Sequence, residues 1–510
     1  MALVIKSYCI PRLYTLYRTF RKFSSTSSAN RKGLVLGVYS AEDGKDIKLS
    51  ERAEKFNQVS QGKLLESIHL TGGSIKPGKS FIFWGLHQDY PAIAVVGLPC
   101  KTEIDECEII RNDKESVRTA IAAGCKALDL AGIKQIFIDS LGDPESAAES
   151  STLSTWKFQD YKTKKDELAT VQPYELQGRD CENWTKGVLL GESQNLARKL
   201  ADTPANLMTP TIFAQQAEDL LRPLGVDVKV YDGEWAKRQK MFALLAVAKG
   251  SVEPPKFLEL TYKKSDGDPY VLIGKGVTFD AGGISLKPAQ SMDEMRADMS
   301  GAACVFATLY GLAKLNVPTS VKVLIPLVEN LPSGNALKPG DVIYARNGKS
   351  ICVDNTDAEG RLILADALCY SLELKPKWVL DIATLTGAMR VALGNAATGV
   401  FSNCTSLYQS LEQAGSETGD RVWRLPLWKH YTKQISENAA YDLNNIGNAK
   451  GGGSCTAAAF LKEFVPKDAK WLHLDIAGVM GPNDSSPYLS KGMTGRPTRT
   501  LINFVERQSK

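Results

Sequence analysis

The sequence predicts an α/β protein with a small N-terminal α/β domain followed by a larger α/β domain whose mainly parallel sheet is flanked by helices. Its 510 residues, 43% of them apolar, are enough for two domains and a tail. Short apolar strand-like segments alternate with helix-like segments along the chain, as in parallel sheets with helices on both faces. No apolar run reaches the length of a membrane-spanning helix.

Residues 32–180 are predicted to form the N-terminal α/β domain. The segment 117–131 has the apolar spacing of a helix. The segment 141–165 is polar and rich in serine, which predicts a loop or a surface insertion. The predicted strands of this domain are 33–39, 80–84, 92–97 and 135–138.

Residues 181–510 are predicted to form the larger domain, entered through a helix near 187–201. Its predicted strands are 257–262, 270–274, 321–328, 378–383 and 471–476. In open parallel sheets, ligands bind at the carboxyl ends of the strands. We therefore expect the loops that follow these strands to carry the functional site.

Residues 1–31 differ in composition from the rest of the chain. The first thirty residues hold five of the 62 basic residues and none of the 57 acidic ones, and they include a serine-rich cluster at residues 24–28. This composition predicts a mitochondrial transit peptide and hence a location in the mitochondrial matrix. The alternative is a basic tail on a cytoplasmic protein. Without this segment the basic and acidic residues balance, so net charge gives no reason to expect nucleic acid binding.

The segment Asn355-Thr356-Asp357-Ala358-Glu359-Gly360-Arg361-Leu362 places two acids and a guanidinium within five residues. If the segment is extended, the three charged side chains share one face. Two carboxylates so close repel each other unless a proton or a metal ion lies between them. A solvated strand face with an internal ion pair is the alternative interpretation.

A second group of charged residues lies about eighty positions upstream. The apolar run 270–273 leads into a glycine-rich loop that carries Lys275 and Asp280, and Lys287 and Asp298 follow. Acids next to apolar segments are rarely buried unless they are paired or bind a metal. Together with the downstream acids, these residues predict a metal site.

These motifs resemble the leucyl aminopeptidase (cytosol aminopeptidase) family, and the resemblance extends from about residue 192 to the end. The segments that carry it are Gly274-Lys275-Gly276-x-Thr278-Phe279-Asp280-x-Gly282-Gly283, Met295-Arg296-x-Asp298-Met299 and the 355–362 motif. The resemblance implies metal ligands at Lys275, Asp280, Asp298, Asp357 and Glu359. It also implies catalytic roles for Lys287 and Arg361. The implied substrate-binding residues are Lys287, Met295, Asn355, Thr384, Leu385, Gly387, Ala477 and Met480.

The function implied by the resemblance is a metal-dependent aminopeptidase that removes leucine-like N-terminal residues through a water activated by two divalent ions. Lys275 must then be a neutral amine, whereas Lys287 stays charged and stabilises the oxyanion. Arg361 is implied to hold a bicarbonate ion as general base. The ligand types alone allow magnesium or manganese as readily as zinc. The resemblance favours zinc, with manganese exchangeable at one position.

The resemblance also implies peptide substrates and a homo-hexamer, with no nucleic acid and no membrane as partners. The alternative function is a structural or scaffold hexamer of the same family, in which catalysis is secondary. The complete set of predicted ligands favours the enzyme, because a purely structural member would be free to lose them.

Overall fold

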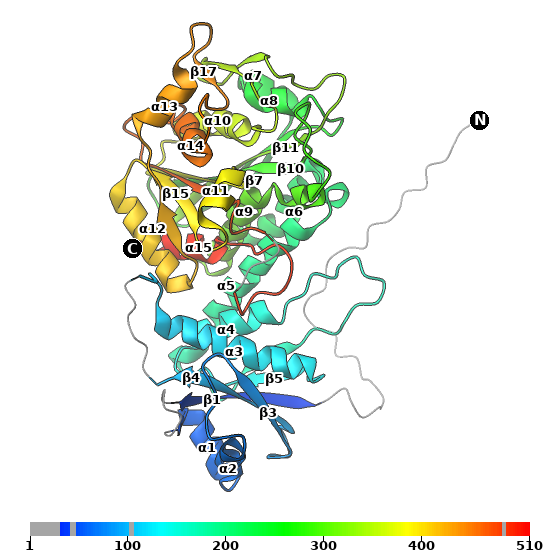
Figure 1. Ribbon diagram of the computed structural model, residues 1–510, viewed down its shortest axis with the longest axis vertical. Coiled ribbons are helices and arrows are strands. Elements are labelled where there is room, and N and C mark those ends of the chain that lie inside the picture. The colour runs from blue at the N-terminus through cyan, green and yellow to red at the C-terminus, as the bar shows by residue number, and fades with distance from the viewer. Residues whose placement is uncertain (1–30, 41–46, 101–106, 482–485, 510) are drawn as a thin grey trace, which may run out of the picture.

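The computed structural model describes residues 31–40, 47–100, 107–481 and 486–509, so the predicted transit peptide lies almost wholly outside the described residues. Two sheets are stacked along the long axis of the molecule, with α5 (Arg179–Asp202) between them (Figure 1). The predicted fold class is confirmed: a small N-terminal domain with a mixed sheet precedes a larger domain with a mainly parallel one. Among the described residues, no helix is both long and apolar enough to span a membrane.

The N-terminal sheet has the strand order β3-β4-β1-β5-β6, with β2 paired to β1. Strand β1 runs parallel to β4 and β5, whereas β2 and β3 pair in antiparallel fashion with β1 and β4. The strands are β1 (Lys32–Ser40), β2 (Ile47–Leu49), β3 (Ser80–Trp84), β4 (Ala92–Pro99), β5 (Gln135–Ile138) and β6 (Thr170–Pro173). The predicted strands 80–84 and 135–138 have these bounds, and the other two are longer by one to two residues at an end.

Helices cover both faces of the N-terminal sheet. Alternate residues of β1 point to opposite faces, as a strand requires. Leu34 and Leu36 pack with α1 (Glu51–Val59) and α2 (Lys63–Leu70), whereas Val35 packs with α3 (Asn112–Leu130) and α4 (Pro144–Ser154). The strands are therefore buried on both sides.

The loop predicted for 141–165 is wrong over residues 144–154, which form the helix α4, whereas residues 155–165 contain neither helix nor strand. Asp143 caps the first turn of α4 by accepting a hydrogen bond from the Ser146 N–H at 3.1 Å, and Pro144 suits the first helical position. The small residues of α4 pack between α5 and α3: a Cβ on Gly187 of α5 would lie 2.2 Å from the Glu145 carbonyl oxygen, and Ser150 Oγ donates a hydrogen bond to the Arg118 carbonyl oxygen of α3. Small side chains here allow two helices to pack closely, and the serine composition was mistaken for a sign of exposure.

The larger sheet has the strand order β16-β15-β18-β14-β9-β11-β8-β7, with β10 paired to β11. Strands β10, β11, β9, β14 and β18 are parallel neighbours, so their carboxyl ends meet at one edge. The strands are β7 (Asp227–Tyr231), β8 (Lys256–Lys263), β9 (Tyr270–Gly274), β10 (Gly276–Asp280), β11 (Ser320–Asn330), β14 (Trp378–Ala383), β15 (Thr398–Ser402), β16 (Val422–Arg424) and β18 (Trp471–Asp475). All five predicted strands are present, each within two residues of its predicted ends.

Helices also cover both faces of the larger sheet. The main α-helices are α6 (Pro210–Leu221), α7 (Gly233–Arg238), α8 (Phe242–Ala248), α9 (Ser300–Lys314), α10 (Gly360–Ser371), α11 (Gly387–Leu393), α12 (Thr405–Thr418), α13 (Lys429–Ser436), α14 (Gly453–Lys462) and α15 (Thr498–Gln508). Leu272 of β9 faces a core shared with α5, α9 and α15, and its neighbour Ile273 faces a core shared with α8, α10 and α14. A small separate sheet consists of β12 (Val342–Tyr344), β13 (Ser350–Cys352) and β17 (Leu443–Asn444).

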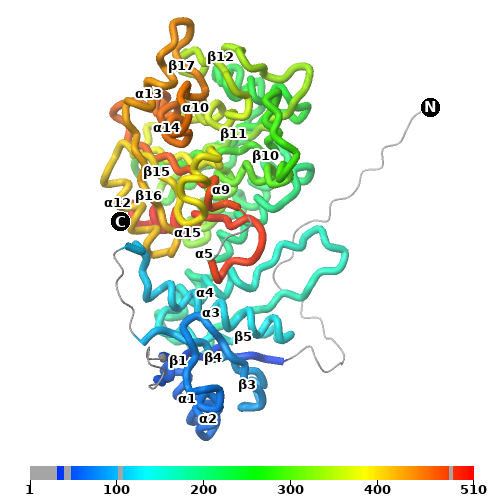
Figure 2. Tube along the Cα trace, in the orientation of Figure 1, coloured from blue at the N-terminus to red at the C-terminus, as the bar shows by residue number. Residues whose placement is uncertain are grey.

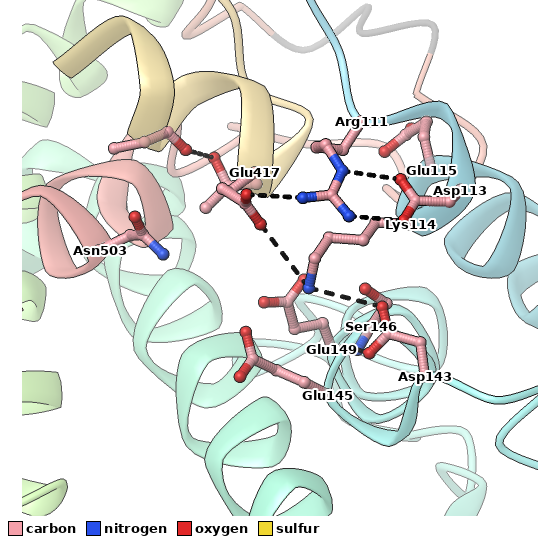
Figure 3. Close-up of polar contacts among 12 residues, drawn as sticks. Arg111, Asp113, Lys114, Glu115, Asp143, Glu145, Ser146, Glu149, Glu417 and Asn503 are labelled. Carbon is pink, nitrogen blue, oxygen red and sulfur yellow. Dashed lines mark hydrogen bonds and ion pairs between the residues drawn. The ribbon is translucent and has the colours of Figure 1, made fainter. Parts of the chain in front are cut away.

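Charged side chains join the two domains. Arg111, next to α3, lies 3.0 Å from Glu417 of α12 (Figure 3). Deeper in the junction, Glu149 of α4 accepts hydrogen bonds from Arg118 of α3 and Arg499 of α15, both at 2.8 Å, and all three side chains are buried. Because a buried charge is stable only when it is paired, these contacts fix how the domains sit on each other.

The C-terminal helix α15 lies against α5 at this junction, so the end of the chain returns to the helix that leaves the N-terminal domain (Figure 2). The boundary that we propose between residues 180 and 181 falls in the first turn of α5.

Candidate metal centre

A cavity of 440 Å³ opens at the edge where the parallel strands end. Asp280 ends β10, and the loops after β9, β14 and β18 supply Lys275, Thr384 and Ala477. All the side chains predicted for the site from the sequence line this cavity: Lys275, Asp280, Lys287, Met295, Asp298, Asn355, Asp357, Glu359, Arg361, Thr384, Leu385, Gly387, Ala477 and Met480. The structure thus brings together residues that are up to about two hundred positions apart.

Three carboxylates form the centre of the cavity. Asp280, Asp357 and Glu359 each offer one oxygen, and these oxygens all lie within 4.8 Å of one another. Asp280 and Glu359 are almost completely buried, and Asp357 is partly exposed. Carboxylate oxygens at this separation suit a divalent cation.

The extended conformation predicted for residues 357–361 is wrong. The Asn355 side chain accepts a hydrogen bond from the Asp357 N–H at 2.8 Å, so the chain turns here, and α10 begins at Gly360. The turn and the helix start still bring both acids to the cavity. A Cβ on Gly360 would lie 2.6 Å from the Lys275 side chain, so glycine allows the helix to approach this lysine.

Two lysines lie among the carboxylates. Lys275 Nζ lies 2.7 Å from Asp298 Oδ2 and 2.8 Å from Glu359 Oε1. Lys287 Nζ lies 2.7 Å from Asp280 Oδ2 and 2.5 Å from Asp357 Oδ1. Burial alone would lower the pKa of Lys275, but the nearby charges of Asp298 and Glu359 outweigh it and raise this pKa. Without a metal, Lys275 is therefore an ammonium, and a neutral amine there requires a cation to displace its proton.

The acids of the centre are crowded enough to favour bound protons or cations. Burial, followed by the charge of Glu359, raises the pKa of Asp280. Burial raises the pKa of Asp298 well above its usual range, although Lys275 opposes this shift. Burial and the charge of Asp280 raise the pKa of Asp357. When ionised, the four carboxylates carry two more charges than the two ammonium groups neutralise, so the site can accept additional positive charge.

Three buried carboxylate oxygens of the centre lack a hydrogen-bond partner in the part of the chain that the structure describes. The buried atoms Asp298 Oδ2, Asp357 Oδ1 and Glu359 Oε1 have no hydrogen-bond partner among the described residues, although each lies within ion-pair distance of a lysine. The lysine contacts of these three oxygens are short enough for ion pairs but lack the alignment of a hydrogen bond. A divalent ion would satisfy these oxygens, so the residues present fit a metal.

Arg361 lies beside this centre, in the first turn of α10. Its Nη1 donates a hydrogen bond to the Asn445 carbonyl oxygen at 2.6 Å, and its buried Nε has no partner among the described residues. Burial lowers the pKa of Arg361 to about 10, which still leaves it charged at neutral pH. A buried guanidinium with an unused N–H is suited to holding an anion.

The predicted substrate-binding residues differ in what they contact. Thr384 Oγ1 donates a hydrogen bond to Asp298 Oδ1 at 2.7 Å, so this hydroxyl positions an acid of the centre. The Asn355 side chain is used in the turn at Asp357. Met480 packs in the core shared with α9 and also forms part of the cavity wall. Met295 is only partly buried.

Three buried residues that position the site were not predicted from the sequence. Asn330, at the end of β11, donates a hydrogen bond to Asp280 Oδ1 at 2.8 Å. Asp475, at the end of β18, accepts hydrogen bonds from the N–H groups of Leu385 and Ala477, both at 3.2 Å. Asn445 holds Arg361 and also donates to the Asn355 carbonyl oxygen at 2.7 Å. The signal available for Asn330 and Asp475 was a polar residue at the carboxyl end of a parallel strand.

The fold and the cavity define an α/β protein with a carboxylate- and lysine-lined centre for divalent cations. Two family models match the chain: the N-terminal domain of the cytosol aminopeptidase family over residues 35–165, and the catalytic domain of the same family over residues 195–502. The chain therefore belongs to the cytosol aminopeptidase family of metal-dependent exopeptidases, and it is an enzyme of this class.

Individual relatives agree with the family models. The chain is 51% identical to the cytosol aminopeptidase of Bos taurus over 486 residues, which cover 94% of this chain and 93% of the relative. It is 50% identical to that of Homo sapiens, with 96% of each chain covered.

Solved structures with the same fold include the bottromycin maturation enzyme BotP, with a TM-score of 0.81, 30% identity, and 94% of this chain and 99% of that chain covered. A second structure of BotP, in complex with Mn, has a TM-score of 0.79 and 29% identity and covers 94% of this chain and 100% of that one.

Proposed function

We propose that this aminopeptidase uses two divalent ions per subunit, held in the cavity at the strand ends, to remove leucine-like residues from the N-termini of short peptides. The close approach of three carboxylate oxygens, within 4.8 Å of one another, carries this proposal. The residues that would hold the ions are Lys275, Asp280, Asp298, Asp357 and Glu359. Zinc is the proposed metal, with manganese exchangeable at one position.

Two divalent ions bound at such a centre lower the pKa of a water molecule and polarise the peptide carbonyl. The protein's contribution is to hold the ligands rigidly. Asn330 fixes Asp280, and Thr384 fixes Asp298, each through a hydrogen bond of 2.7–2.8 Å. Fixed ligands do not have to reorganise during the reaction, and this preserves the stabilisation of the transition state.

We assign the oxyanion of the transition state to Lys287. Its ammonium is partly exposed to the cavity, and Asp280 and Asp357 raise its pKa although burial opposes them, so it stays charged. A fixed positive charge beside a developing oxyanion lowers the barrier by several kcal/mol, of the order of 3 kcal/mol.

We propose that Arg361 holds a bicarbonate ion, which would act as general base. The unused Nε of its buried guanidinium supports this assignment. Arginine itself is too basic to accept a proton at neutral pH.

The substrate side chain is proposed to contact Met295, Thr384, Leu385, Gly387, Ala477 and Met480, with Asn355 at the same wall. Most of these surfaces are apolar, and this favours leucine-like residues.

Turnover of leucine p-nitroanilide by the purified protein tests the proposal. A chelator should lower the rate by about 100-fold or more, and added manganese or zinc should restore it, because bound ions would activate the attacking water and polarise the carbonyl. Full turnover by protein from which all metal has been removed would exclude the proposed centre.

We propose a homo-hexamer on the basis of the family resemblance. A closed assembly would restrict access to short peptides. Light scattering of the purified protein should give about six times the 55.6 kDa mass of the chain, less any cleaved leader. A mass of one subunit at micromolar concentration would contradict the hexamer and would also remove the scaffold alternative.

We propose that residues 1–31 direct the protein to the mitochondrial matrix, because they are basic and contain no acid. A fusion of residues 1–35 to a fluorescent protein should accumulate in mitochondria. A diffuse cytosolic signal would favour the alternative of a basic tail.

A further inference from the structure

Four cationic side chains line the cavity, and one of them differs from the rest. Lys275 and Lys287 lie against carboxylates at 2.5–2.8 Å, and Arg361 donates a hydrogen bond at 2.6 Å. Arg390 of α11 has only a loose contact: its Nη1 lies 3.9 Å from Glu294 Oε2, beyond hydrogen-bond distance, and no closer partner exists among the described residues. Its side chain is 60% exposed, so it is the cation of this cavity that stays available to a new anion.

The backbone at Arg390 is held in place by its helix, although the guanidinium has only one distant contact. Helix α11 is capped by the Thr386 side chain, which accepts a hydrogen bond from the Met389 N–H at 3.1 Å, and Met389 is buried. The same helix packs tightly on the turn after Ala477, where a Cβ on Gly478 would lie 2.1 Å from the Gly394 carbonyl oxygen. A fixed helix presents the arginine at a constant position in the cavity wall.

The Arg390–Glu294 pair is connected to the carboxylate centre by a short stretch of chain. Glu294 lies in the short helix η3 (Met292–Ala297), and Asp298 follows directly. Four residues at a rise of about 2 Å each place Glu294 about 8 Å from Asp298 along this helix. A peptide whose amino terminus lies at the carboxylate centre extends by about 3.3–3.6 Å per residue, so the carboxyl end of a dipeptide or tripeptide lies at a similar distance.

We propose that Arg390 binds the free α-carboxylate of short peptide substrates and thereby makes dipeptides and tripeptides better substrates than their C-terminal amides. Glu294 competes with this carboxylate, since it holds the guanidinium loosely when no peptide is bound. This inference rests on the proposed function, because it places the amino terminus of the peptide at the carboxylate centre. The enzyme would then recognise the C-terminal end of a short peptide as well as its amino terminus.

The test compares a leucyl dipeptide with its C-terminal amide, which lacks only the negative charge. In the wild type, kcat/KM for the free acid should exceed that for the amide by about 3- to 10-fold, the effect of one partly exposed charge-assisted pair. Arg390→Gln should bring this ratio close to one, and Arg390→Glu should invert it. Glu294→Gln should increase the ratio. Because each ratio is taken within one variant, changes in folding or metal content cancel.

Arg222→Gln is the matched control, since Arg222 is a half-exposed arginine that does not line the cavity and is paired with Glu218. It should keep the wild-type ratio. A wild-type ratio of one, or an unchanged ratio in Arg390→Gln, would overturn the assignment of Arg390. In either case, metal-dependent turnover of leucine p-nitroanilide would show that the proposed function stands. A wild-type protein that hydrolyses none of the three substrates would overturn the proposed function itself.

Discussion

Glu359→Gln and Asp357→Asn are each expected to lose at least one metal ion and to lower kcat by about 10³-fold or more. Each substitution keeps the shape of the side chain and removes a charge from the group of oxygens within 4.8 Å. Glu359 is also buried beside Lys275, so an amide there cannot compensate a cation. Metal content by elemental analysis and turnover of leucine p-nitroanilide measure both effects.

The fold should survive these changes, because Lys275 keeps Asp298 as a partner. Circular dichroism checks this point, and Asp266→Asn serves as the control, since Asp266 is fully exposed on the surface. Turnover like that of the wild type in either variant, with metal content unchanged, would rule out a ligand role for the substituted residue.

Lys287→Ala is expected to lower kcat by two to four powers of ten while the metal ions stay bound. In the structure this ammonium lies between Asp280 and Asp357, so its removal leaves the two carboxylates less neutralised and more favourable to cations. Metal affinity should therefore not fall, and the loss should appear in catalysis alone. Lys275→Ala is the informative comparison, because it should lose metal.

An exposed lysine provides the control for Lys287→Ala. Lys263→Ala removes a side chain that is 62% exposed and only loosely paired with Asp266 at 3.8 Å, and turnover should not change. If Lys287→Ala instead lost metal in proportion to activity, the roles assigned to the two lysines would be reversed.

Much of the fold could be predicted from the sequence because its strands are apolar and end at clear breaks. The predicted strands 270–274 and 378–383 have the bounds found in the structure. Helix α4 was missed because helix formation there depends on close packing against α5, and local polarity gives no sign of that partner. Asp143-Pro144, a cap followed by a favourable first residue, was the available local signal.

The residues predicted for the candidate site line one cavity, but the local conformation predicted for residues 357–361 was wrong. The residue types at Lys275, Asp280 and Asp298 carried the resemblance, and the structure places them in one cavity. The extended conformation predicted around Asp357 was wrong because the spacing of charges along a chain does not distinguish a strand from a turn. The Asn355 side chain decides in favour of the turn.

Long-range positioning residues could not be found by spacing. Asn445 reaches Arg361 from more than eighty positions away, and Asp475 holds Leu385 across a similar separation. Such contacts depend on strand order, and the order in this sheet follows neither the sequence nor a local pattern.

The number of metal ions bound per subunit tests the two-ion centre most directly. Metal-stripped protein would be titrated with manganese and then with zinc, with bound metal and leucine p-nitroanilide turnover measured at each addition. We expect turnover to rise with occupancy and to become complete at two ions per subunit, and Glu359→Gln to fall short of that number. Complete turnover with one ion per subunit, or with none, would contradict a two-ion centre built from Asp280, Asp357 and Glu359.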